Sequence, residues 1–252
     1  MDIEQAIAQS HLICVDVIEN HNKFWSAWVL ENGDLWVKYG RVGHTAQSKL
    51  HAIGNVNATT QKLNTLVKQK QAKGYQVAAI ANSKYLDYSL LTNGSAIQDE
   101  IEDIQQQWKR MEPFSLIRFH PELGQFRSLS GGLSADAVTI ARSLLERIQT
   151  HYRRGDDEFI PAVEAYIRVI PMRSTAKLNA HDLLGSRLKL SQQAELLDTL
   201  DRCLSQVDRI RALIQSTLNG NDRSAWLSWG AVPNPIATGF SDDGRSSAIH
   251  WN

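Results

Sequence analysis

The residues best suited to chemistry in this sequence are an aromatic ring, a glycine and an arginine in direct succession. Tyr39, Gly40 and Arg41 end a short strand-like run that starts at Leu35. A tyrosine ring can stack on a sugar or a base, and a glycine lets another molecule approach the backbone closely. A guanidinium group can pair with a phosphate through two parallel hydrogen bonds. Together these residue types indicate contact with nucleic acid rather than a covalent reaction.

Basic side chains dominate the segment around this cluster. Residues 20–75 hold eight basic and two acidic side chains, a local charge of +6, although the chain of 252 residues is neutral as a whole. Such segregation of charge favours a polyanionic partner. We expect three lysines to neutralise phosphates beside the aromatic and the arginine. The predicted nucleic-acid-binding set is therefore Lys23, Lys38, Tyr39, Gly40, Arg41 and Lys49.

Each of these residues also has a structural alternative. Arg41 can form an ion pair within the chain, or meet an acidic surface of another protein. Tyr39 can pack against a sheet, Gly40 can serve a plain turn, and each lysine can simply be solvated. Three tryptophans of the same region fit core packing better than a ligand site: Trp25, Trp28 and Trp36.

Enzyme, metal and cofactor motifs are absent from the sequence. It contains no P-loop, no GxGxxG and no GxSxG. His44 and His51 are seven residues apart and lack Cys or paired carboxylate neighbours, and Asp242-Asp243 is typical of a solvated turn. We therefore predict no catalytic residue, no metal and no cofactor. An enzyme with an unrecognised site is a third reading, which a deep polar pocket with convergent titratable groups would favour.

The cysteines and the hydropathy of the sequence indicate the cellular compartment of the protein. Cys14 and Cys203 are far apart and have no CxxC partner, which favours a reduced intracellular protein. Apolar runs stay well short of the roughly 20 residues of a membrane helix. The acidic start, residues 1–4, lacks the basic segment of a secretory signal. We expect a cytoplasmic protein without a membrane partner.

The elements that must position the cluster are strands. Residues 11–18, 24–30, 35–39 and 47–53 are rich in β-branched and aromatic side chains, and Asn32-Gly33 between two of these runs predicts a hairpin. A helix capped by Asn57 or Thr59 should follow and end before Gly74. Residues 1–80 are thus predicted to be a small basic antiparallel sheet with one helix.

The remaining chain is predicted to be mostly helical. After a linker at residues 81–95, an all-helical bundle is expected at residues 96–220, with one helix capped by Ser134 and a long one at 191–218. Residues 221–252 are Pro-, Gly- and Ser-rich with scattered aromatics. The predicted fold class is α+β, a β domain followed by an all-α domain.

The segment from Phe24 to Tyr75 resembles a WGR domain. The matching features are the strand that enters residues 39–43, Tyr-Gly-Arg-Val-Gly, then Gln47, and a helix ending at residues 73–75, Lys-Gly-Tyr. Tyr39 replaces the signature tryptophan, so it offers less stacking area and no indole donor, and Ala46 stands where a glycine is common. The resemblance implies DNA contact, and it gives Arg41 a second role in connecting domains.

Residues 96–218 resemble the helical regulatory domain of poly(ADP-ribose) polymerases. The residues that carry this resemblance lie at 123–126, 133–145, 165–171 and 196–200. In those enzymes an ADP-ribosyltransferase domain follows, whereas about thirty residues follow here. The two resemblances imply a non-catalytic, weakly sequence-specific DNA-binding and regulatory protein that contacts ends or breaks. Its helical part would bind a separate effector protein. The alternative is a protein–protein adaptor that binds no nucleic acid.

Overall fold

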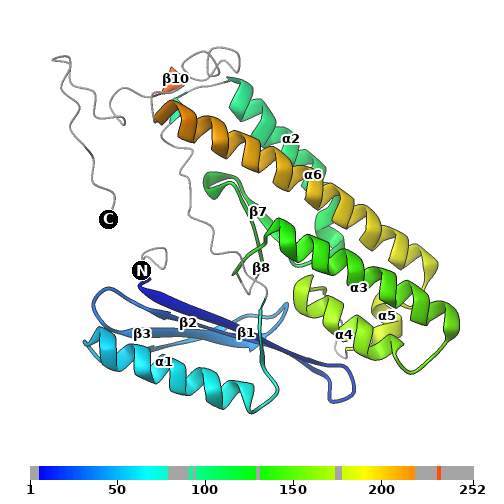
Figure 1. Cartoon of the computed structure of the whole chain (residues 1–252), viewed down its shortest axis with the longest axis horizontal. Coiled ribbons are helices and arrows are strands. Elements are labelled where there is room, and N and C mark those ends of the chain that lie inside the picture. The colour runs from blue at the N-terminus through cyan, green and yellow to red at the C-terminus, as the bar shows by residue number, and fades with distance from the viewer. Residues whose placement is uncertain are drawn as a thin grey trace.

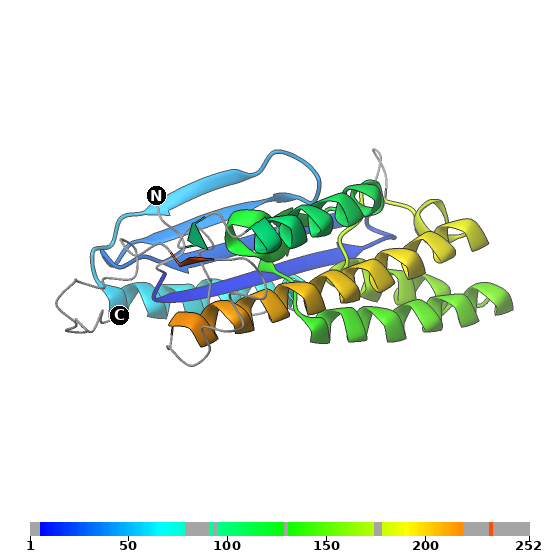
Figure 2. The same cartoon turned by 90° about the horizontal axis from the view of Figure 1, so that it is seen from above.

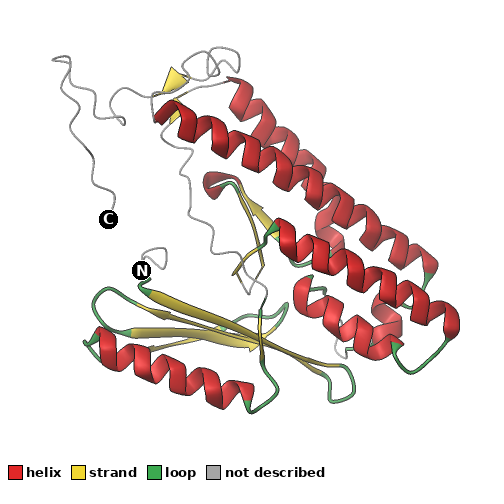
Figure 3. Ribbon diagram, viewed as in Figure 1, coloured by secondary structure: helices red, strands yellow, loops and turns green. Residues whose placement is uncertain are grey.

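The computed structural model has the α+β architecture that the sequence predicts. It describes residues 6–78, 91–92, 95–128, 131–173, 178–218 and 232–233. A five-stranded antiparallel sheet with one helix is followed by a helical part (Figure 1; Figure 3). Among the described residues, none of the helices is both long enough and apolar enough to span a membrane.

The sheet is a meander with one short added strand. β1 (Ala8–Asp16), β2 (His21–Val29), β3 (Leu35–Arg41) and β4 (Gln47–His51) pair in sequence, and β5 (Gln76–Val77) joins the free side of β1. The order is β4-β3-β2-β1-β5, and β4 is an edge strand. The four longer strands confirm the predicted runs with ends shifted by a few residues, and the predicted hairpin joins β2 to β3.

The sheet helix α1 (Val56–Gln71) begins earlier than predicted. Its N-cap is Asn55, whose Oδ1 accepts from the backbone N of Ala58 at 2.9 Å. The prediction of Asn57 or Thr59 as the cap was wrong, because Asn55 is the last residue with extended backbone and a short polar side chain. Thr59 is instead buried and donates to the backbone O of Gly33 at 2.6 Å.

The start of α1 is tied to the β2–β3 hairpin. Gly33 has φ +79°, and a Cβ at this position would lie 2.5 Å from the backbone N of Asn55. The adjacent Asp34 uses Oδ1 to accept from the backbone N of Ile53 at 2.8 Å and of Gly54 at 3.0 Å. Because only glycine permits this approach, the hairpin and the helix hold each other in place.

The described residues of the helical part form five α-helices. They are α2 (Ser95–Met111), α3 (Ala135–Arg154), α4 (Phe159–Val169), α5 (Ala180–Leu184) and α6 (Arg187–Leu218). Ser134 is the N-cap of α3, as predicted, and accepts from the backbone N of Ala137 at 3.2 Å. Gly155 ends the same helix at φ +66°.

This part is not wholly helical. β7 (Arg118–His120), β8 (Gln125–Ser128) and β9 (Gly131–Gly132) form a three-stranded antiparallel sheet between α2 and α3. Phe119 and Phe126 are cross-strand partners in it, and Trp108 of α2 packs edge-on against Phe126 with ring centroids 5.0 Å apart. The expectation of an all-α bundle missed these strands because each is only two to four residues long.

The predicted linker and tail meet at one point. β6 (Leu91–Thr92) pairs antiparallel with β10 (Val232–Pro233). The other residues of the tail at 221–252, Asp242-Asp243 included, lie outside the described residues, as does most of the linker at 81–95.

The two faces of the large sheet belong to different cores. Leu12, Trp25 and Val37 point to α1 and pack with Leu63. On the other face, Ile13, Val15 and Phe24 join a single cluster that extends through the helical part. In Figures 1 and 2 the helical part meets the sheet near the β1–β2 turn, while α2 and α6 rise away from it towards the opposite end. Among the described residues, the helical part therefore covers the sheet near the β1–β2 turn, on the face opposite α1.

Three polar contacts join the sheet to the helical part. Glu164 of α4 accepts from the backbone N of Val17 at 2.6 Å, and Arg168 donates to the backbone O of Val15 at 2.8 Å. Oδ1 of Asn20, in the β1–β2 turn, accepts from the backbone N of Leu178 at 2.8 Å. The turn is thus fastened to α4 and to the segment before α5.

Candidate nucleic-acid interface

The pairing register divides the six predicted site residues between the two faces of the sheet. Tyr39 lies across from Trp25, and Arg41 lies across from Lys23. Because cross-strand partners share a face, both pairs point to the α1 side with Leu12 and Trp25. Lys49, opposite Val37, is on this side as well. Lys38 and Gly40 alternate with these residues and face the other way.

Arg41 is held by the β1–β2 turn. Its Nη1 donates to the backbone O of Asn20 at 3.0 Å, and its Nη2 donates to Oδ1 of the same residue at 2.7 Å. Asn20 has φ +53°, a left-handed conformation that asparagine adopts more readily than most residues. Within the described residues, the hydrogen-bond partner of Arg41 is therefore the neutral Asn20, and no carboxylate there forms the ion pair of the structural alternative.

Two further lysines reach the same end of the sheet from α1. Lys70 and Lys73 belong to the C-terminal end of this helix and the turn that follows. Burial lowers the pKa of Lys70, and the positive charges of Lys73 and Lys23 lower it further. Nζ of Lys70 lies 5.0 Å from the ring centroid of Tyr75, within cation–π range. We call Lys23, Arg41, Lys70 and Lys73 the basic end.

Sequence reasoning did not place Lys70 and Lys73 in the site. The signal was present, because Lys73 adjoins the Gly74-Tyr75 pair that ends the helix. What the sequence did not show is that the C-terminus of α1 comes back to the row formed by Cys14, Lys23 and Arg41. Cys14 in this row is a buried free thiol whose pKa burial raises, which makes it inert rather than reactive.

Two acidic side chains of the β1–β2 region belong to the same end of the sheet, Asp16 and Glu19. Asp16 closes β1 opposite His21, and its Oδ1 accepts from the backbone N of Glu19 at 2.7 Å. That bond holds the carboxylate in the β1–β2 turn. The four positive charges of the basic end therefore outnumber these two negative charges, and the nearby carboxylate of Glu164 is paired with Arg168.

Tyr39 combines a packing role with an accessible ring. It is half-buried and packs at the margin of the cluster formed by the sheet and α1. Gln47, its cross-strand partner on the edge strand β4, is exposed. The sheet-packing alternative is therefore correct for one side of the ring, while the ring stays next to Arg41 on the open margin.

The structure adds to what the sequence indicates for Gly40 and Lys49. A Cβ on Gly40 would lie 3.4 Å from Cα of Ala46 and 3.6 Å from Cε1 of Phe24. Its small size therefore serves packing within the domain. Lys49 is exposed on β4, where its charge and that of Lys62 assist burial in lowering the pKa of His51. Lys49 therefore stands at the edge of the sheet, in a second basic group.

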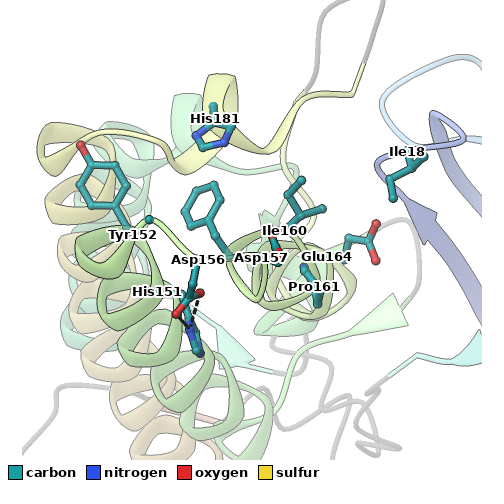
Figure 4. A pocket seen from close by; sticks show the side chains of 11 residues that line it. Ile18, His151, Tyr152, Asp156, Asp157, Ile160, Pro161, Glu164 and His181 are labelled. Atoms are coloured by element: carbon teal, nitrogen blue, oxygen red, sulfur yellow. Dashed lines mark hydrogen bonds and ion pairs between the residues drawn. The ribbon is translucent and has the colours of Figure 1, made fainter.

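A pocket of about 540 Å³ lies elsewhere, between the β1–β2 turn and the helical part (Figure 4). His151 and Asp156 form an ion pair at 2.8 Å on one wall, and His151 lowers the pKa of Asp156. His181 is stacked on Phe159 with ring centroids 4.7 Å apart. The lining contains no serine, cysteine or lysine, and its titratable side chains are those of His151, Tyr152, Asp156, Asp157, Glu164 and His181.

Metal ligands do not gather in the described part of the chain. No group of three or more His, Cys, Asp or Glu side chains there could hold a metal ion. In the His151–Asp156 pair, Nδ1 of the histidine is within hydrogen-bond distance of both carboxylate oxygens. The basic end, in contrast, combines positive charges with an aromatic ring. It can bind an anionic polymer.

Comparison with known proteins gives one family match. Residues 8–82 match the family model described as the WGR domain, which covers the whole sheet and α1. The search of curated proteins returned no match. The resemblance of residues 96–218 to the regulatory domain of poly(ADP-ribose) polymerases stays a prediction. The match and the sheet geometry agree on one conclusion, that residues 8–82 of this chain are a WGR domain, a non-catalytic domain of the nucleic-acid-binding and regulatory type.

Proposed function

We propose that this protein binds DNA at strand ends or breaks through the basic end of its WGR domain. The observation that carries the proposal is the convergence of four basic groups from three elements. Lys23 comes from β2, Arg41 from β3, and Lys70 and Lys73 from the end of α1. Tyr39 lies on the same face as Lys23 and Arg41, two positions before Arg41 in β3, so a phosphate and a terminal sugar or base could be held together.

Phosphate contact at this site is electrostatic and carries little sequence information. The basic side chains reach phosphates rather than base edges, so they position the protein without reading bases. Each neutralised phosphate releases condensed counterions and makes the affinity depend on salt. The proposed binding is therefore weakly sequence-specific and strongly salt-dependent, although the chain has no net charge.

A salt titration tests this proposal. Fluorescence anisotropy would compare nicked, blunt and closed circular duplexes of one sequence. We expect binding at about 50 mM salt that weakens by at least ten-fold towards about 200 mM. Nicked and blunt duplexes should bind more tightly than the closed circle. Absence of binding at the lower salt concentration would overturn the proposal, and equal binding to all three forms would remove the preference for ends.

The helical part is proposed to bind an effector protein, and the β1–β2 turn connects the helical part to the rest of the WGR domain. Exposed apolar side chains of two helices could contribute to such a contact: Ile140 of α3 is 46% exposed and Leu188 of α6 is 68% exposed. Asn20 accepts both from Arg41 and from Leu178, which links the basic end to the helical part through one side chain. Crosslinking of the wild type and of Ile140→Glu with candidate transferases or nucleases would test the surface.

A protein–protein adaptor is the second candidate, and one observation favours it. Arg41 already donates to two oxygens of Asn20, so part of its fork is engaged within the chain. The remaining donors and the three lysines could equally meet an acidic protein surface. Competition between duplex DNA and an acidic peptide for the wild type separates the candidates. An adaptor would prefer the peptide at equal charge.

A further inference from the structure

On the face of the WGR sheet that carries Lys38, opposite α1, two tryptophans pack into neither of the two hydrophobic cores. Trp28 of β2 and Trp36 of β3 are cross-strand partners, with ring centroids 4.8 Å apart. Both are half-buried, whereas Trp25 is only 3% exposed and lies in the core, as expected for all three. Within the part of the chain that the structure describes, neither ring packs against either hydrophobic cluster. Their presence on a sheet face therefore needs another explanation.

The register surrounds this pair with a row of accessible residues. Gln9, Trp28, Trp36 and Leu50 stand side by side across β1 to β4, and Leu50 is 46% exposed. The neighbouring row on the same face is His11, Ser26, Lys38 and Ser48. The two rows contain one lysine and no acidic residue. We call Trp28, Trp36, Lys38 and Leu50 the aromatic face.

The aromatic face is held in a fixed arrangement. His11 packs edge-on against Trp28 with centroids 5.2 Å apart, and its Nδ1 lies 3.0 Å from Oγ of Ser26. Burial, assisted by the charge of Arg127, lowers the pKa of His11 to about 4, so the ring is neutral at physiological pH. A rigid neutral support under Trp28 keeps the two indoles adjacent, and a preorganised surface loses less entropy on binding.

We propose that the aromatic face binds the bases of a single-stranded segment of nucleic acid. Aromatic rings on adjacent strands of a sheet offer successive bases a stacking surface, and the π-face of every base is suitable. Lys38 supplies the charge for the accompanying phosphate. This inference deepens the proposed function, because an overhang leaving the basic end would cross the edge strand β4 to reach it. All residues of β4 except His51 are exposed, so that route is open.

The experiment compares three probes under one set of conditions. They are a blunt duplex, the same duplex with an overhang of about four thymidines, and the free oligothymidine. We expect the overhang to tighten binding by about ten-fold relative to the blunt duplex. Equal affinity for the blunt and overhanging duplexes would overturn the inference. If neither duplex bound, the proposed function would fail, and free oligothymidine would decide the aromatic face separately.

Variants identify the surface responsible. Trp36→Leu should abolish the gain from the overhang and leave the blunt duplex bound, which also reports that the domain is folded. Lys38→Gln, which leaves the indoles in place, should lower the gain by about two- to three-fold. Lys109→Gln is the matched control, because it removes the same charge from an exposed position on α2, away from the sheet. If Trp36→Leu and Lys38→Gln kept the full gain, a protein partner would be the better occupant and the inference would be wrong.

Discussion

Arg41 and Asn20 face each other across the end of the WGR sheet, joined by hydrogen bonds of 3.0 Å to the backbone O and 2.7 Å to Oδ1. The same Oδ1 accepts from the backbone N of Leu178, which precedes α5. A single asparagine therefore connects the arginine of the signature motif with the helical part. This geometry allows the binding role of Arg41 to be separated experimentally from its structural role.

Arg41→Gln and Asn20→Gly should have different effects. Arg41→Gln removes a charge from the basic end, so it should weaken duplex binding and reduce the slope of log K against log salt by about one. Asn20→Gly removes the Oδ1 acceptor and keeps the backbone O, and the φ of +53° at this position suits glycine. It should lower the free energy of unfolding by about 1–2 kcal/mol and leave the salt slope unchanged. A salt slope lowered equally by both variants would contradict this separation.

Glu164 should stabilise the junction between the sheet and the helical part. It accepts from the backbone N of Val17 at 2.6 Å, and its other oxygen lies 3.5 Å from Arg168. Glu164→Ala leaves a part-buried donor and a part-buried guanidinium without this partner, at a cost of about 1–3 kcal/mol. Hydrogen exchange at Val17 should accelerate. Glu195→Ala, an exposed position on α6, is the control, and similar exchange in both variants would argue against the contact.

The local signals of the sequence were sufficient for most of the fold. Asn32-Gly33 predicted the hairpin, and Ser134 predicted the start of α3, because each acts through backbone groups within a few residues. The short strands β7 to β9 were not predicted, because two to four residues are too few to show the alternation of apolar and polar side chains that is typical of a strand.

The sequence indicated the motif residues of the proposed site, but it did not show which other residues lie around them. Tyr39, Arg41 and Lys23 are neighbours on one face, but Lys38 is on the other. The face of a residue depends on the strand register, and a shift of one position would exchange the two sets. Lys70 and Asn20 reach Arg41 or Lys23 only through tertiary packing, so their roles could not be predicted from sequence spacing.

Gly33→Ala should destabilise the WGR domain strongly. The new Cβ would lie 2.5 Å from the backbone N of Asn55, in addition to the strain of φ +79°. Gly74→Ala is the control, because φ is +82° there but a Cβ would meet no atom within 4 Å. We expect Gly74→Ala to cost about 1 kcal/mol in thermal or urea unfolding and Gly33→Ala clearly more. Equal costs would show that the hairpin does not restrain α1.

The stability of the protein should depend on pH through His11. Its pKa is lowered to about 4 by burial and by the charge of Arg127, against 6.5 in the unfolded chain. Between these values the unfolded state binds a proton that the folded state does not, so stability falls as pH falls from about 6.5 to 4. The loss is at most about 3 kcal/mol. His11→Gln should show a shallower fall in urea titrations, and an identical fall would contradict the assignment.

The most direct test of the central claim removes charges from the basic end and from a distant surface. Lys70→Gln/Lys73→Gln lowers the charge at the end of α1, and Lys109→Gln/Arg110→Gln removes two exposed charges from α2. Both double variants have the same net charge. Duplex binding measured by fluorescence anisotropy over a range of salt should show the slope of log K reduced by about two in the first variant and unchanged in the second. Equal slopes in the two variants would contradict binding at the basic end of the WGR domain.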